Sequence, residues 1–177
     1  MSRLVVDPNR SEGHEELFSQ WSQTLPLPER RRLVTHYHRS HRLRVRRAVE
    51  AASNEGRRPV VHLAVHTFTP VLDGVEREVD VGILFDPTRE FESRIAHVWR
   101  AAIRTRCPEL RVCFNEPYDG RSDGLTSALR TTFDAEGGPE YAGIELELNQ
   151  ALIESEGRFP DPLAAALADT LKQVLGG

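Results

Sequence analysis

The stretch Val60-Val61-His62-Leu63-Ala64-Val65 decides the fold class of this 177-residue chain. Such a nearly continuous apolar run predicts a strand that is buried on both faces, as in sheets that helices cover from both sides. Before it, residues 28–53 repeat apolar side chains at the spacing of a helix, and Pro28 suits the first helical turn. After it, residues 79–85 predict another strand, which Asp86-Pro87 ends.

The rest of the chain continues this alternation of helices and strands. Further helices are predicted over residues 90–106, 125–130 and 161–175, and further strands over residues 4–6, 110–114 and 141–148. The alternation predicts an α/β fold, a three-layer sandwich with a mixed, mostly parallel sheet. Without an interdomain linker or an internal repeat, the sequence predicts one domain over residues 1–177.

Charge and composition exclude several classes of partner. The net charge of -4 argues against nucleic-acid binding, which requires a cationic surface. The arginines between residues 30 and 58 lie on several faces of the predicted helix without an aromatic stacking platform, so they indicate a solvated helix. No apolar run approaches a membrane span of roughly 18 to 20 residues. Cys107 and Cys113 match no common redox or metal motif and indicate reduced thiols in the cytoplasm.

Polar residues follow the predicted strands. They occupy residues 7–10, 66–69, 86, 115–118 and 145–150. In open α/β sheets, ligands bind beyond the carboxyl ends of the strands. The sequence therefore predicts a ligand site at that edge of the sheet.

Glu145 and Glu147 are the most informative of these residues. They alternate with apolar residues in one strand, so both side chains point to the same face. Burying a carboxylate costs several kcal/mol unless it is paired, protonated or bound to a metal. The pair therefore indicates a metal, a cationic partner or general-base chemistry. The alternative is an edge strand with a solvated acidic face.

His66 and Asn9-Arg10 are two further candidates. His66 is predicted to end its strand, where a neutral imidazole could bind Zn²⁺ or transfer protons; a hydrogen-bonded structural histidine is the alternative. The guanidinium of Arg10 can bind a carboxylate in bidentate fashion, and Asn9 adds a donor and an acceptor. A turn with a solvated arginine is the alternative there.

Six segments in order resemble the N-formylglutamate amidohydrolase family. Ser2-Arg3-Leu4-Val5-Val6-Asp7-Pro8-Asn9-Arg10 is followed by Val65-His66-Thr67-Phe68-Thr69-Pro70 and by Asp80-Val81-Gly82-Ile83-Leu84-Phe85-Asp86. Asn115-Glu116-Pro117-Tyr118-Asp119-Gly120, Ser122-Asp123-Gly124-Leu125-Thr126 and Gly143-Ile144-Glu145-Leu146-Glu147-Leu148-Asn149-Gln150 complete the set. Each segment is weak alone, but their order over residues 2–150 is specific.

The resemblance implies a fold similar to that of zinc carboxypeptidases and aspartoacylases, and a role for each matching residue. Asp7, Asn9 and Arg10 are expected to bind the substrate carboxylate, with Asn115 and Tyr118 as further substrate contacts. His66 is expected to bind a divalent metal, which the family resemblance implies is zinc. Glu147 is expected to activate water, with Glu145 as its neighbour or substitute.

The resemblance also implies a part that lies outside this sequence. Family members begin with another strand and a His-bearing loop that supplies further metal ligands, and the match starts just after that region. We therefore expect an incomplete metal site and an exposed sheet edge that favours self-association into a homo-oligomer. Two hypotheses follow. The first is a metal-dependent amidohydrolase that cleaves an N-acyl amino acid such as N-formylglutamate, and the second is a degenerate member that binds a small carboxylate without hydrolysis.

Overall fold

The computed structural model describes residues 5–53, 58–153 and 157–176. Its contacts divide the chain into two compact units, one of Met1–His62 with Ser122–Ala142 and the other of Leu63–Arg121 with Gly143–Gly177. The expectation of one domain over residues 1–177 stays a prediction.

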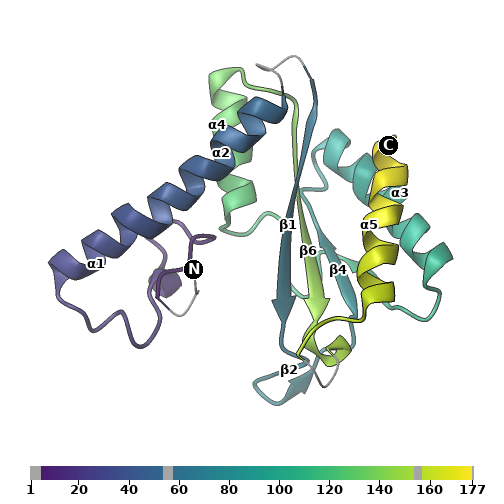
Figure 1. Cartoon of the computed structure of the whole chain (residues 1–177), viewed down its shortest axis with the longest axis horizontal. Helices are drawn as coiled ribbons and strands as arrows, with labels where there is room; N and C mark the ends of the chain where they lie inside the picture. Colours follow the sequence, from purple (N-terminus) through teal and green to yellow (C-terminus); the bar gives the residue numbers. More distant parts are fainter. Residues whose placement is uncertain (1–4, 54–57, 154–156, 177) are drawn as a thin grey trace. The chain divides into compact units, whose positions relative to one another are not determined.

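The central element is a mixed four-stranded sheet with the strand order β1-β6-β4-β5 (Figure 1). The strands are β1 (Val60–Phe68), β4 (Val81–Leu84), β5 (Val112–Phe114) and β6 (Tyr141–Asn149). β1 and β6 run in the same direction, β6 and β4 are antiparallel, and β4 and β5 are parallel. Two of the three pairings are thus parallel, and the predicted α/β fold with a mixed, mostly parallel sheet is confirmed.

Helices α3 (Glu90–Arg106) and α5 (Asp161–Leu175) lie side by side in the second unit (Figure 1). The indole of Trp99 is fully buried between them and donates to the hydroxyl of Thr170 at 3.1 Å. Glu92 ties α3 to the sheet, because its carboxylate accepts hydrogen bonds from the backbone N–H of Asp86 at 2.9 Å and of Gly143 at 3.0 Å. Trp99 thus joins α3 to α5, and Glu92 joins α3 to the residues at the end of β4 and the start of β6.

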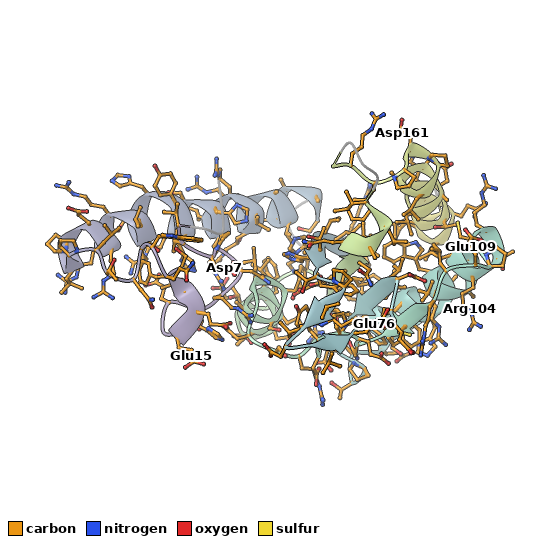
Figure 2. All side chains as sticks on the ribbon, turned by 90° about the horizontal axis from the view of Figure 1, so that it is seen from below. Asp7, Glu15, Glu76, Arg104, Glu109 and Asp161 are labelled. Carbon is orange, nitrogen blue, oxygen red and sulfur yellow. The ribbon has the colours of Figure 1, made fainter. Side chains whose placement is uncertain are left out.

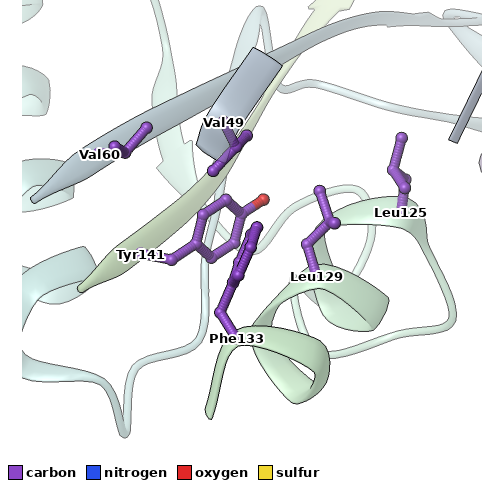
Figure 3. Close-up of a cluster of buried hydrophobic side chains, with 6 residues drawn as sticks. All are labelled: Val49, Val60, Leu125, Leu129, Phe133 and Tyr141. Atoms are coloured by element: carbon purple, nitrogen blue, oxygen red, sulfur yellow. The ribbon is translucent and has the colours of Figure 1, made fainter. Parts of the chain in front are cut away.

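The first unit has a separate apolar core (Figure 3). Its helices are α1 (Leu27–Leu33), the π-helical segment η2 (Val34–Arg39), α2 (Ser40–Ala52) and α4 (Leu125–Glu136). Figure 3 shows Phe133 and Leu129 of α4 facing Tyr141, with Val49 of α2 on the other side of the ring. The buried phenol hydroxyl of Tyr141 forms a hydrogen bond of 2.7 Å with Nδ1 of His62. The core therefore holds α2, α4 and the first residues of β1 and β6 together.

The remaining elements are short. They are the 3-10 turns η1 (Glu15–Leu17) and η3 (Gln150–Leu152) and the hairpin strands β2 (Val71–Leu72) and β3 (Val75–Glu76). Asp73 and Gly74 join β2 to β3, and both have positive φ, as a two-residue hairpin turn requires. No helix among the described residues is long and apolar enough to cross a membrane.

Two sequence expectations about strands are wrong. β1 continues to Phe68 rather than ending at His66, and it lies at one end of the strand order. Val65 is 58% exposed, so β1 is not buried on both faces. A run of apolar residues cannot distinguish a terminal strand from a central one, because the backbone of both has the same pleated geometry. In the strand expected at residues 4–6, Val6 forms only an isolated bridge with Phe18, and residue 4 lies outside the described residues.

The direction of β4 also differs from what its sequence suggested. Because β4 is antiparallel to β6, its last residues lie where β6 begins, and Glu92 joins Asp86 to Gly143 there. Asp86 is therefore at the opposite edge of the sheet from the carboxyl ends of β1 and β6. At the expected ligand edge, beside the end of β6, lie instead the residues that precede β4.

Candidate active site

Glu145 and Glu147 lie on the central strand β6, between β1 and β4. They are only 8% and 5% exposed, so the alternative of a solvated edge strand is excluded. Antiparallel pairing with β4 sets Glu147 opposite Gly82 and Glu145 opposite Leu84. Both carboxylates consequently point to the same face of the sheet.

His66 joins this acidic pair from the neighbouring strand. Its Nε2 lies 3.8 Å from Oε2 of Glu145, and both side chains are largely buried. The imidazole therefore lies on the face that carries Glu145 and Glu147. The structure brings together three of the predicted site residues, although 79 positions separate His66 from Glu145.

A loop after β5 covers the same face at Gly82. A Cβ atom at this position would lie 2.0 Å from the backbone oxygen of Glu116 and 3.3 Å from Cβ of Glu147. Only the absence of a side chain allows the backbone of Glu116 to approach the sheet so closely. Gly82 thus places the loop directly beside Glu147.

Asn115 shapes this loop. It adopts a positive φ of 50°, and its Oδ1 accepts hydrogen bonds from the backbone N–H of Phe85 at 3.0 Å and of Gly120 at 3.2 Å. The peptide bond between Glu116 and Pro117 is cis. Because Oδ1 is already hydrogen-bonded within the loop, a substrate contact of Asn115 would use Nδ2. This contact stays a prediction.

Tyr118 lies in the same loop after β5, and its side chain contacts Arg77. Arg77 was not among the site residues predicted from the sequence. Nη1 of Arg77 donates to the Tyr118 hydroxyl at 3.2 Å, and the guanidinium lies 5.3 Å from the centre of the Tyr118 ring. The guanidinium also lies 5.7 Å from the ring of Phe68, the last residue of β1. Arg77 comes before β4 in the chain. It could have been predicted as a site residue only if the antiparallel direction of β4 had been known.

Asp7, Asn9 and Arg10 belong to the first unit. They lie in a turn that contacts the residues at the start of α4. Oδ1 of Asp7 accepts from the backbone N–H of Asn9 at 2.9 Å, and Oδ1 of Asn9 accepts from the N–H of Leu125, the first residue of α4, at 2.7 Å. The guanidinium of Arg10 donates to the backbone oxygen of Asp123 at 3.3 Å and lies 3.4 Å from the carboxylate of Glu16. Asn9 therefore has a structural role as a cap of α4.

Two side chains, His38 of η2 and Arg42 of α2, also bind the backbone of this turn. Nη1 of Arg42 donates to the backbone oxygens of Pro8, Asn9 and Arg10 at 3.0 to 3.2 Å. The buried ring of His38 forms a hydrogen bond of 2.8 Å through Nε2 with the oxygen of Arg10. For Arg42 the expectation of a solvated helix face is wrong, because its charge neutralises three backbone dipoles that converge on one point.

The predicted site residues therefore form two groups. His66, Glu145 and Glu147 lie together in the second unit with Asn115 and Tyr118, and Asp7, Asn9 and Arg10 lie together in the first. The expected convergence of Arg10 with His66 and Glu147 stays a prediction.

A comparison with protein families accounts for this combination of residues. The family model of N-formylglutamate amidohydrolase matches residues 1–154. The chain belongs to this family. Membership makes it a hydrolase that acts on linear amides, and it confirms the family resemblance of the six sequence segments.

Solved structures agree with the fold of an N-formylglutamate amidohydrolase family member. The crystal structure of gene product Atu2144 from Agrobacterium tumefaciens is 28% identical with a TM-score of 0.73; the match covers 99% of this chain and 68% of that one. The N-formylglutamate amidohydrolase from Ralstonia eutropha JMP134 is 18% identical with a TM-score of 0.68, over 98% of this chain and 72% of that one. The latter likeness concerns the fold alone. No curated protein matches the sequence.

The metal expected from the family resemblance does not fit the described residues by themselves. His66 and Glu145 offer two donor groups, and catalytic zinc sites use three protein ligands and an open position. Within residues 5–53, 58–153 and 157–176, no group of three or more His, Cys, Asp or Glu side chains could hold a metal ion. We therefore assign no reaction step to a metal.

Proposed function

We propose that this family member hydrolyses the amide bond of an N-acyl amino acid such as N-formylglutamate. The observation that carries the proposal is the buried acidic pair Glu145 and Glu147 beside His66. Burial of a carboxylate costs several kcal/mol unless the group is paired, protonated or bound, so a buried acidic pair beside a histidine marks a candidate catalytic site. The family match over residues 1–154 supports the same reaction class.

In the proposed reaction Glu147 acts as the general base. Its carboxylate takes a proton from a water molecule as the water oxygen attacks the acyl carbon, and it later passes that proton to the departing nitrogen. The C–N bond breaks, and N-formylglutamate yields formate and glutamate. The backbone of Glu116 covers Gly82 beside Glu147. This supports the role of Glu147, since the covering loop limits the access of bulk water to its carboxylate.

His66 and Glu145 have a supporting role in the proposal. Nε2 of His66 lies 3.8 Å from Glu145, and an imidazolium at this place would stabilise negative charge that develops on the acyl oxygen. This role uses only groups that the described residues contain. Dependence on zinc stays an expectation from the family resemblance, and a zinc titration of the chain tests it.

We further propose that Arg10 binds a carboxylate of the substrate. Its guanidinium is held in place by the oxygen of Asp123, while Arg42 and His38 fix its backbone. The ion pair with Glu16 is long and solvent-exposed, so a substrate carboxylate can replace it at little cost. The free thiols of Cys107 and Cys113 support the proposal that the enzyme works in the reducing cytoplasm.

The second candidate is a degenerate member that binds a small carboxylate without cleaving an amide. It is favoured because, among the described residues, no third metal donor joins the pair of His66 and Glu145. The two candidates differ in turnover and agree in ligand binding, so one pair of assays separates them.

The test is the release of formate from N-formyl-L-glutamate, followed by proton NMR. We expect turnover by the unmodified chain and a loss of about 10²- to 10⁴-fold in kcat for Glu147→Gln, the range that general-base catalysis contributes. Glu109→Gln is the matched control, because Glu109 is exposed on the same unit (Figure 2). Binding of L-glutamate without any release of formate would refute the hydrolase proposal in favour of the degenerate member. Equal rates for Glu147→Gln and Glu109→Gln would refute the role of Glu147.

A further inference from the structure

Arg77 lies at the edge of the sheet where the acidic strand ends. It immediately follows β3 and precedes β4, and its backbone oxygen accepts a hydrogen bond of 3.1 Å from Nδ2 of Asn149, the last residue of β6. Because β4 is antiparallel to β6, the entry to β4 and the end of β6 meet there. Arg77 is thus close to the end of the strand that carries Glu147.

The side chain of Arg77 reaches the face that carries the acidic pair. Phe68 is two residues beyond His66 on β1, so the two side chains share a face. His66 is next to Glu145, and β1 and β6 run in the same direction, so Phe68 and Glu147 occupy the next positions along that face. The Arg77 guanidinium lies 5.7 Å from the Phe68 ring and 5.3 Å from the Tyr118 ring.

The charge of Arg77 is not balanced by a carboxylate of the described residues. Its side chain contacts two aromatic rings and the Tyr118 hydroxyl, and forms no salt bridge with any described Asp or Glu. Other arginines of this unit differ: Arg111 pairs with Glu78, and Arg121 pairs with Asp119. Two rings hold the guanidinium in one orientation and leave hydrogen-bond donors for an anion.

We propose that Arg77 is the specificity residue of this site: it binds the side-chain carboxylate of the substrate, so that an acidic side chain is preferred to the neutral amide of the same shape. This inference rests on the proposed function, in which Glu147, in the same unit as Arg77, acts on the amide of that substrate. A planar fork held against aromatic rings suits a carboxylate, and it discriminates against a neutral amide of the same shape. Tyr118 is a positioning residue for Arg77.

The experiment compares an acidic ligand with its neutral isostere. Affinities for L-glutamate and L-glutamine are measured by calorimetry, and hydrolysis of their N-formyl derivatives is measured with the same proteins. We expect Arg77→Met to weaken L-glutamate binding by about 10- to 100-fold, the value of a charge-assisted hydrogen bond, and to leave L-glutamine binding unchanged. Arg77→Lys retains part of the preference. Arg104→Met is the control, because Arg104 is exposed on α3 (Figure 2).

The outcomes separate this inference from the proposed function. A preference for L-glutamate that disappears in Arg77→Met and persists in Arg104→Met supports the inference, even if no variant releases formate and the hydrolase proposal falls. A preference that persists in Arg77→Met overturns the inference, even if the unmodified chain is an active hydrolase. An equal loss of affinity for both ligands also overturns it, since a structural role would weaken both alike.

Discussion

Replacing Gly82 with alanine is expected to destabilise the second unit and displace the loop over Glu147. The new Cβ would lie 2.0 Å from the oxygen of Glu116, 3.2 Å from its carbonyl carbon and 3.3 Å from Cβ of Glu147. Contact at an ordinary separation of about 3.5 Å requires the Glu116 oxygen to move by about 1.5 Å. β4 cannot yield instead, because it is hydrogen-bonded to β5 on one side and β6 on the other.

The magnitude follows from the cost of inserting a methyl group into a packed interior. Overpacking costs about 1 to 3 kcal/mol in the free energy of unfolding. For a chain of this length each kcal/mol lowers Tm by about 2 to 4 °C, so Gly82→Ala should lower it by about 2 to 12 °C. We also expect a lower kcat on N-formyl-L-glutamate, because the shifted Glu116 backbone no longer covers Glu147.

The assay is thermal unfolding followed by circular dichroism, with formate release measured on the same samples. Gly13→Ala is the matched control, because a Cβ at Gly13 meets no atom within 4 Å and its φ lies outside the left-handed region. If Gly82→Ala and Gly13→Ala unfold at the same temperature, the close approach of Glu116 to β4 is wrong. A normal kcat in a clearly destabilised Gly82→Ala would separate the packing argument from the role of the loop in catalysis.

Three further predictions concern single groups. Arg10→Lys should raise KM for N-formyl-L-glutamate by about 10-fold or more and Arg31→Lys should not, because lysine keeps the charge but loses the bidentate fork; equal KM values would contradict the role of Arg10. Zinc titration by calorimetry should reveal no tight stoichiometric site in the 177-residue chain, and tight binding abolished by His66→Ala would contradict this. The hydrogen bonds and charge of Arg121 lower the pKa of Asp119 to about 2; because the folded pKa is depressed, the stabilisation is present above about pH 4 and is lost as the pH falls towards 2. An NMR titration in which Asp119 has the same pKa with and without Arg121→Ala would disprove this pairing.

Local patterns in the sequence were sufficient for several elements and for the chemistry of the acidic strand. The helix predicted over residues 161–175 coincides with α5, because the amphipathic period and the entry proline are properties of adjacent residues. The strand with Glu145 and Glu147 was equally predictable, since alternation fixes which side chains share a face whatever lies beside the strand. The resemblance of six ordered segments was specific enough to identify the family.

Tertiary structure alone decided the direction of β4 and the neighbours of each strand. A run of apolar residues has the same pattern when read in either direction, so it could not predict that Asp86 would lie at the opposite edge and that Arg77 would lie near the end of β6. Nor could it predict that β1 would be a terminal strand with Val65 exposed. Side-chain periodicity depends on residues next to each other in the chain, whereas strand order and direction depend on hydrogen bonds between residues that the sequence separates by tens of positions.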